Sequence, residues 1–234
     1  MAVTYYNPQW GASRPIRGIL FDMDGLVLDS EILFTRFWRE AANALGYPMT
    51  VEQSYGMRSL GKKLGQPYLE SLFGPGIDYT TLREKRIELM SAYVAKHGIA
   101  PKPGIYELLD YMETKGIASA IASSSPMDAI EKHLEAVNLK HRFQKLCSAH
   151  SISNGKPAPD IYLLAAAELG LKPEECLALE DSPTGILSAY RAGCLPVMIP
   201  DLDQPGEDTE KLLFAKADSL TDIINLLKMQ NGHL

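Results

Sequence analysis

The chain has 234 residues, of which 46% are hydrophobic and 22% are charged, and its formal net charge is −6. This size and composition are typical of a globular protein with one large or two smaller domains. The acidic balance argues against a nucleic-acid partner, and no apolar run is long enough to span a membrane. Three widely separated cysteines are expected to be buried, reduced thiols of a cytoplasmic protein.

The N-terminal residues 1–15 are polar and aromatic, and prolines and a glycine interrupt them. This segment lacks the apolar stretch that a secretory signal needs, so export is not expected. We expect residues 1–15 to form a loosely held extension, and we assign it no function.

A short apolar run, residues 19–21, ends in two aspartates one residue apart, Asp22 and Asp24, followed by Gly25. The run predicts a buried strand whose carboxyl end is marked by Asp22, and ligands of open α/β sheets bind at such ends. Two carboxylates there repel each other unless a cation or a shared proton compensates them. Taken alone, the stretch also fits an acidic turn, because Asp and Gly both favour turns.

Residues 31–100 show helical patterns and no convincing strand. Apolar side chains recur every four residues along 31–45, which places them on one face of a helix. Glycines interrupt 51–73, which predicts short helices and turns, and 79–97 is again helical. We therefore expect an all-helical domain over residues 31–100, inserted after the first strand.

From residue 101 onward, strand-like runs alternate with helical segments. The expected strands are 117–122, 145–149, 176–179 and 195–199, and the last helix is 220–227. Ser125-Pro126 and Ser182-Pro183 each predict a helix start with serine as the cap and proline first in the helix. The alternation indicates right-handed βαβ units and a parallel sheet. The predicted fold is α/β, with a Rossmann-like core of residues 16–30 and 101–234.

Polar residues follow each of the first four predicted strands. In chain order they are Asp22 and Asp24, then Ser123, Ser124 and Ser125, then Lys156, and finally Glu180 and Asp181. Parallel strands bring these groups to one edge of the sheet, close to helix N-termini. Carboxylates are suitable ligands for Mg2+, and hydroxyls, backbone N–H groups and a lysine can bind a phosphate dianion. A carboxylate can also attack phosphorus, while a second acid transfers protons, so the edge suits phosphoryl transfer.

At these residues the chain resembles the haloacid dehalogenase superfamily, in its phosphatase and phosphomutase branch, over about residues 17–227. The four motifs of the superfamily occur in order, each after its own strand, as Asp22-Met23-Asp24-Gly25, Ser123, Lys156 and Glu180-Asp181. The stretches 155–160 and 179–185 are especially similar to the branch that includes β-phosphoglucomutase and small sugar-phosphate phosphatases.

The resemblance implies a role for each acid. Asp22 would be the nucleophile and a metal ligand. Asp24 would be the general acid/base, with its backbone carbonyl on Mg2+. Asp181 would be a further carboxylate ligand, and Glu180 would be a ligand or a support for the ligands.

The resemblance also implies how the substrate is held. Ser123 and Lys156 would bind the phosphoryl group, and Ser124 competes with Ser123 for this role. Ser125 is interpreted first as a helix cap and second as a substrate contact. The inserted domain would be a mobile cap, in which Arg58 either grips the substrate or is an ordinary exposed arginine.

Three functions remain open on the sequence. We expect an Mg2+-dependent, monomeric phosphatase acting on a small phosphorylated metabolite such as a sugar phosphate. A β-phosphoglucomutase-type mutase is the alternative, although residues 30–34 lack the histidine that such mutases carry there. A non-catalytic phosphate-binding or receiver-like regulatory module is the third. Asp24 argues against a receiver, because a stable phospho-aspartate does not suit an adjacent acid/base.

Overall fold

The computed structural model describes residues 3–10, 15–58 and 60–231. The chain forms two compact units, which we call the core domain (Met1–Leu28 and Ala100–Leu234) and the helical domain (Asp29–Ile99). The sequence placed the two divisions after residues 30 and 100, whereas in the structure they fall after residues 28 and 99.

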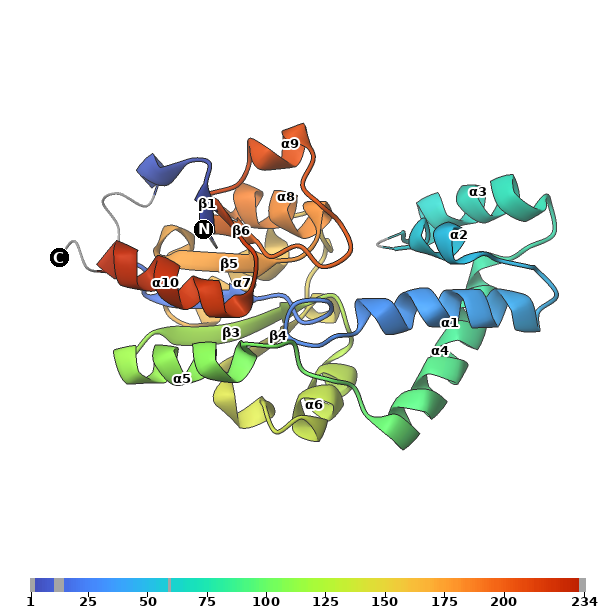
Figure 1. Cartoon of the computed structure of the whole chain (residues 1–234), viewed down its shortest axis with the longest axis horizontal. Coiled ribbons are helices and arrows are strands. Elements are labelled where there is room, and N and C mark those ends of the chain that lie inside the picture. Colours follow the sequence, from blue (N-terminus) through green and yellow to red (C-terminus); the bar gives the residue numbers. More distant parts are fainter. Residues whose placement is uncertain (1–2, 11–14, 59, 232–234) are drawn as a thin grey trace. The chain divides into compact units, whose positions relative to one another are not determined.

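A seven-stranded sheet lies at the centre of the core domain, in the order β1-β7-β6-β5-β2-β3-β4 (Figure 1). The strands are Val3–Tyr5 (β1), Gly18–Phe21 (β2), Ala118–Ser123 (β3), Lys145–Ser148 (β4), Cys176–Glu180 (β5), Leu195–Met198 (β6) and Ala215–Ala217 (β7). All neighbouring strands are parallel except β1, which is antiparallel to β7. Strands β2 and β5 are buried along their whole length, as expected of parallel strands covered on both faces. The predicted α/β fold is thus confirmed.

Helices cover both faces of this sheet (Figure 1). They are Ile105–Lys115 (α5), Met127–Ala136 (α6), Asp160–Glu168 (α7), Pro183–Ala192 (α8), Glu207–Glu210 (α9) and Leu220–Asn231 (α10). Helices α5 and α10 pack together on one face, and α7 and α8 pack together on the other. Between α7 and the sheet, fully buried residues such as Ile161 of α7, Leu20 and Ala120 form an apolar cluster. These helices hold the strands in place and direct the loops at the strand ends.

The start of α8 is formed as the serine-proline pair predicts. Pro183 is the first helical residue, where a fixed φ costs nothing and no N–H is needed. The Ser182 hydroxyl accepts a hydrogen bond from the Gly185 N–H at 3.1 Å. This cap sets the direction in which the chain leaves β5.

The N-terminal segment is not the loosely held extension that the sequence predicted. Val3–Tyr5 forms β1, which pairs with Ala215–Ala217 of β7. The Tyr5 ring packs edge-on against Phe214, with ring centroids 5.6 Å apart, and the Asn7 side chain donates to the Leu213 carbonyl at 2.8 Å. Residues 1–2 and 11–14 of this segment lie outside the described residues.

The helical domain contains Glu31–Ala44 (α1), Val51–Tyr55 (α2), Lys62–Phe73 (α3) and Tyr79–His97 (α4). Among its described residues there is no strand, in agreement with the sequence. Helix α1 packs along α4 and against α2, and its buried side of Phe37, Trp38 and Ala41 explains the four-residue repeat. A separate apolar cluster that includes Trp38, Leu69 and Leu82 gives this domain its own core.

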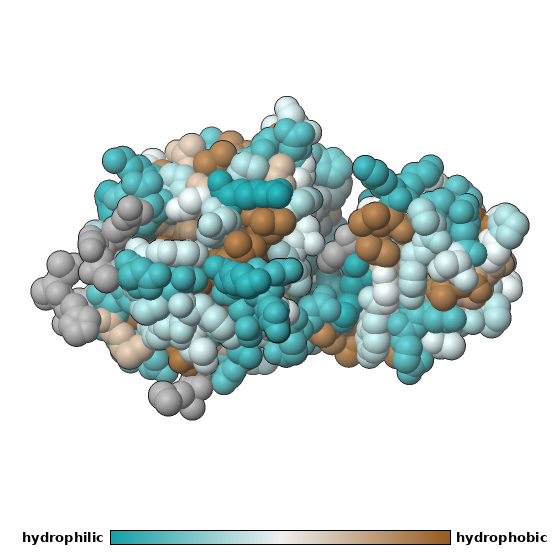
Figure 2. All heavy atoms as spheres, turned by 90° about the horizontal axis from the view of Figure 1, so that it is seen from above, coloured by the Kyte–Doolittle hydropathy of each residue, from teal (hydrophilic) through white to brown (hydrophobic). Residues whose placement is uncertain are grey.

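Hydrophilic side chains cover most of the face shown in Figure 2, with small hydrophobic patches between them. Exposed large apolar side chains, such as Ile32, Leu64, Tyr106 and Met229, belong to different helices. Within the described part of the chain, no helix combines the length and the apolar character that crossing a membrane requires.

Candidate active site

The predicted site residues of the core domain come from the carboxyl ends of adjacent strands. In the sheet register, Phe21 at the end of β2 lies beside Ile121 of β3 and Leu179 of β5. The Asp22 N–H continues this ladder by donating to the Leu179 carbonyl at 3.0 Å. The residues that follow each strand therefore meet at one edge, as the topology predicted.

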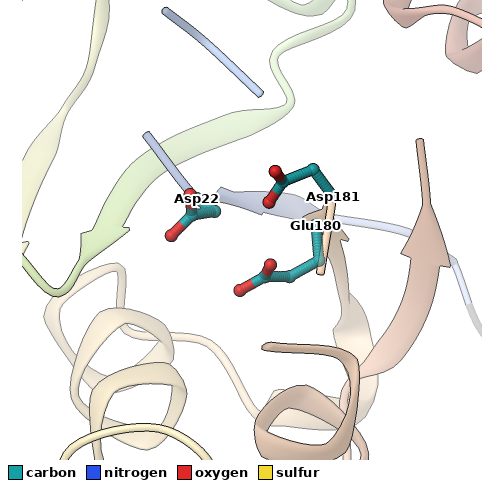
Figure 3. A group of neighbouring side chains, drawn as sticks. All are labelled: Asp22, Glu180 and Asp181. Atoms are coloured by element: carbon teal, nitrogen blue, oxygen red, sulfur yellow. The ribbon is translucent and has the colours of Figure 1, made fainter. Parts of the chain in front are cut away.

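Three of the predicted acids gather at this edge. Carboxylate oxygens of Asp22, Glu180 and Asp181 all lie within 4.8 Å of one another, and the three residues are 8%, 1% and 9% exposed. Figure 3 shows that Glu180 and Asp181, although neighbours in sequence, leave the backbone in different directions. Buried carboxylates this close repel each other unless cations compensate them. The donor set is made of hard oxygen ligands and fits Mg2+.

Lys156 supplies part of the compensating charge. Its Nζ lies 2.5 Å from Asp22 Oδ1 and 2.6 Å from Glu180 Oε1, and its side chain is 8% exposed. Burial alone would lower the pKa of Lys156, but the attraction of these two carboxylates outweighs burial, and the pKa lies above its usual value. The ammonium is therefore a permanent positive charge beside Asp22.

Asp22 remains difficult to ionise even with this lysine beside it. Burial raises the pKa of Asp22 to about 8, and repulsion from Glu180 and Asp24 acts in the same direction, whereas Lys156 opposes both. A second cation held by the carboxylates would lower this pKa, because an opposite charge nearby favours the ionised form. The charge balance thus gives a second reason why the site suits a metal ion.

Helix α8 holds the loop that carries Lys156. The buried Ser188 hydroxyl donates to the Ala158 carbonyl at 2.6 Å, and Arg191 donates to the Pro157 carbonyl at 3.0 Å. Both acceptors lie within two residues of the lysine, so the loop is fixed where the lysine begins. The sequence indicated Lys156 but gave no sign of these two supports.

Three side chains donate hydrogen bonds to the Glu180 carboxylate. Its Oε1 accepts from Lys156 Nζ and from the Tyr162 hydroxyl, both at 2.6 Å, and its Oε2 accepts from the Ser182 hydroxyl at 3.2 Å. A Cβ atom at Gly185 would lie only 1.8 Å from the Glu180 carboxyl group, so this position has room only for glycine. These contacts fix Glu180 at the site, and whether it is a metal ligand or a support for the ligands stays a prediction.

Tyr162 was missed by the sequence reasoning. It lies in α7, is fully buried, and its ring centroid is 5.1 Å from Lys156 Nζ. Burial, and then the nearby Glu180 carboxylate, raise the pKa of Tyr162 well above its usual value, so it stays a neutral donor. In the sequence it is one more apolar position of a helix, and only the fold brings it to the acids.

The three serines after β3 have different surroundings. Ser123 is fully buried, and its hydroxyl accepts from the Ser125 N–H at 3.1 Å, whereas Ser124 is exposed. Ser125 does not cap α6 as predicted, because Pro126 is the residue before the first helical residue, Met127. Its hydroxyl instead donates to Asp24 Oδ2 at 3.0 Å. That phosphate binds at Ser123 or Ser124 and that substrate contacts Ser125 stay predictions.

The remaining candidates are Asp24 and Arg58. Asp24 is half-buried, and its carboxylate is not part of the three-acid group found among the described residues. Arg58 belongs to the helical domain, where its guanidinium lies 5.2 Å from the Tyr55 ring centroid. Its contact with substrate therefore stays a prediction.

Buried acids and a lysine at the carboxyl edge of a mainly parallel sheet are the arrangement expected of an α/β enzyme that transfers phosphoryl groups. Residues 19–199 match the family model described as haloacid dehalogenase-like hydrolase, and the chain belongs to this family. Both the resemblance and its implied enzyme class, a phosphoric monoester hydrolase, are confirmed by the relatives.

Two curated relatives match nearly the whole chain. A phosphorylated carbohydrates phosphatase of Thermotoga maritima is 28% identical over 218 residues, which cover 91% of this chain and 99% of the relative. Hexitol phosphatase B of Escherichia coli K12 is 28% identical over 226 residues, which cover 90% of this chain and 95% of the relative. A crystal structure of CbbY from Rhodobacter sphaeroides, in complex with phosphate, superimposes with a TM-score of 0.72 at 26% identity, covering 89% of this chain and 96% of the other.

Proposed function

We propose that this chain is an Mg2+-dependent phosphatase that hydrolyses a small phosphorylated metabolite, a sugar or polyol phosphate, through an aspartyl-phosphate on Asp22. The observation that carries the proposal is the group of three buried carboxylates with Lys156 against Asp22. The relatives named for phosphorylated carbohydrates and for hexitols support the substrate class. We propose further that the enzyme acts as a cytoplasmic monomer.

Asp22 and Asp181 would hold the Mg2+, with the backbone carbonyl of Asp24 as a further ligand, and Glu180 would support them. When bound, the ion offsets the negative charge of carboxylate and phosphate, so that the two anions can approach each other. The Lys156 ammonium would bind the negatively charged phosphoryl oxygens, and the Ser123 hydroxyl would donate a further hydrogen bond to them.

The chain's own acids would carry the two chemical steps. In the first, Asp22 attacks phosphorus, the bond to the leaving oxygen breaks, and Asp24 gives that oxygen its proton. In the second, Asp24 takes a proton from water, whose oxygen attacks the phosphoryl group and frees the Asp22 carboxylate together with inorganic phosphate. The helical domain, with Arg58 as the candidate contact, would select the leaving group.

The direct test is Mg2+-dependent phosphate release from p-nitrophenyl phosphate, followed by a screen of hexose, pentose, polyol and nucleotide monophosphates. We expect wild type to release phosphate, Asp22→Asn to release none above background, and the matched surface variant Asp110→Asn to behave as wild type. A wild type without activity, or an Asp22→Asn variant with full activity, would contradict the assignment.

The mutase remains the second candidate, because it shares every core residue with the phosphatase. The two differ in whether water or a sugar hydroxyl takes the phosphoryl group from Asp22. Incubation with β-glucose 1-phosphate and catalytic β-glucose 1,6-bisphosphate separates them. Phosphate release supports the phosphatase, whereas rapid formation of glucose 6-phosphate without phosphate release supports the mutase.

A further inference from the structure

We propose that Tyr162 is a positioning residue for Lys156, and that it acts through Glu180. This inference rests on the proposed function, since it concerns the cation that would bind the phosphoryl group. The Tyr162 side chain is fully buried and its hydroxyl donates to Glu180, so we assign it a positioning role and no contact with substrate.

Tyr162 and Lys156 share one hydrogen-bond acceptor. Glu180 Oε1 accepts two hydrogen bonds of 2.6 Å, one from the Tyr162 hydroxyl and one from Lys156 Nζ. A carboxylate oxygen has two lone pairs, and both are used here. The tyrosine therefore fixes the atom to which the lysine is anchored, and it withdraws part of the negative charge that pulls on the ammonium.

The Lys156 ammonium lies between two carboxylates. Lys156 Nζ is 2.5 Å from Asp22 and 2.6 Å from Glu180, so a small change in either attraction shifts it. Without the Tyr162 hydroxyl, Glu180 carries a less compensated charge and draws the lysine away from Asp22. The Tyr162 ring, whose centroid is 5.1 Å from Nζ, limits the movement of the lysine from another direction.

The Glu180 carboxyl group is itself restrained by its neighbours. The Ser182 hydroxyl holds Oε2 at 3.2 Å, and Gly185 lies directly against the carboxyl group. The Glu180 side chain is thus fixed on several sides, by Tyr162, Ser182 and Gly185. Its exposed fraction is 1%. Glu180 therefore offers Lys156 a fixed anchor.

The test is Tyr162→Phe, which removes the hydroxyl and keeps the ring. The matched control is Tyr6→Phe, which removes a similar tyrosine-to-carboxylate bond, that of Tyr6 to Glu210 at 2.9 Å, on another part of the core domain. Three quantities are measured: kcat for p-nitrophenyl phosphate, the dissociation constant of inorganic phosphate by calorimetry in the presence of Mg2+, and that of Mn2+ by electron paramagnetic resonance. Thermal unfolding shows whether each variant is folded.

We expect Tyr162→Phe to lower kcat by roughly ten- to a hundredfold and to weaken phosphate binding, as observed when supports of a site residue are removed. Tyr162→Phe should change Mn2+ affinity much less than it changes phosphate affinity. Glu180→Gln should still bind Mn2+, weakened by up to about a hundredfold as a support of the ligands, whereas Asp181→Asn should lose Mn2+ binding. The double variant Tyr162→Phe/Glu180→Gln should bind phosphate no more weakly than Glu180→Gln alone, because the hydroxyl acts through Glu180.

An active wild type with an unchanged Tyr162→Phe variant would overturn the inference and leave the proposed function standing. Loss of Mn2+ binding in Tyr162→Phe would also overturn it, since the hydroxyl would then act on the metal site and not on the lysine. A wild type that releases no phosphate contradicts the proposed function and removes the basis of the inference. If Tyr162→Phe does not fold, comparison of Glu180→Gln with wild type for Mn2+ and phosphate binding still decides whether Glu180 anchors the lysine.

Discussion

At the scale of single residues, Lys156 places a positive charge against two buried carboxylates, those of Asp22 and Glu180. Loss of one partner from a buried ion pair leaves an uncompensated charge, which costs far more than the loss of a surface pair. The same residue type also forms a surface pair, Lys145 with Glu168, with both side chains nearly half exposed. The surface pair of Lys145 is therefore a control for the buried pairs of Lys156.

We predict that Lys156→Gln lowers the free energy of unfolding by about 3 kcal/mol, whereas Lys145→Gln changes it by less than about 0.5 kcal/mol. Urea unfolding of both variants, without added metal, measures the difference. Equal effects of the two substitutions would mean that the lysine beside Asp22 is not an essential compensating charge.

Gly185 shows how little space surrounds the acids. A Cβ at this position meets the Glu180 carboxyl at 1.8 Å, so Gly185→Ala must displace Glu180 or the start of α8. We predict a loss of stability of about 1–3 kcal/mol, the usual cost of overpacking, and a large loss of phosphatase activity. Gly206→Ala is the control, because no atom lies within 4 Å of its Cβ. An active, stable Gly185→Ala variant would show that Glu180 can move freely.

Some residues of the site could be predicted from the sequence and others could not. The acids, Lys156 and Ser123 could be predicted because each lies at the carboxyl end of a strand or in the loop after it, and strand ends converge in a parallel sheet. Tyr162 could not, because nothing in the sequence says that a tyrosine within an apolar helix reaches a carboxylate 18 residues away. Ser125 was misinterpreted because its hydroxyl has two possible uses, and the bond to Asp24 replaced the helix cap.

At the scale of elements, the regular part of the core domain could be predicted from alternating apolar runs and helices. Strands β2 to β6 appear within about two residues of their predicted positions, and all of them except β4 contain four or more buried residues. Strands β1 and β7 have three residues each, too few to show a pattern in the sequence. Their pairing is a long-range event that joins the two ends of the chain.

This pairing predicts that β1 contributes to stability and not to chemistry. We expect Tyr5→Ala to lower the free energy of unfolding by about 1–2 kcal/mol, because Tyr5 loses its edge-on contact with Phe214. The kcat for p-nitrophenyl phosphate should be unchanged, since the acids follow β2 and β5. Thr4→Ala, on the exposed side of the same strand, is the control. A Tyr5→Ala variant as stable as Thr4→Ala would show that β1 is dispensable.

At the scale of the whole molecule, the chain combines a core domain that carries the predicted chemistry with a helical domain that has its own apolar core. The predicted state of the three cysteines is confirmed, since Cys147, Cys176 and Cys194 are buried and free. Burial raises the pKa of Cys147 to about 11 and of Cys176 to about 12, and it raises the pKa of Cys194 as well. Few thiolates therefore form in the folded protein at neutral pH.

We predict that the folded protein does not react with Ellman's reagent at pH 8, and that three thiols react after unfolding in guanidinium chloride. Unfolded cysteines ionise near pH 8.5, below the folded values, so the unfolded state binds fewer protons there, and stability should fall as the pH rises above 8.5. Denaturant titrations between pH 8 and pH 10 measure this slope. Rapid reaction of the native protein would contradict the burial of these thiols.

In the proposed reaction Asp22 takes the phosphoryl group and Asp24 promotes its release, and an Asp24→Asn variant separates these two roles. p-Nitrophenolate leaves without needing a proton, so this variant should still form the aspartyl-phosphate but hydrolyse it slowly. Acid quenching after mixing with p-nitrophenyl phosphate and Mg2+, followed by peptide mass spectrometry, should find one phosphoryl group on the peptide that contains Asp22. The double variant Asp22→Asn/Asp24→Asn should show none. A phosphoryl group on another peptide, or undiminished turnover by Asp24→Asn without any phosphorylated peptide, would contradict the account.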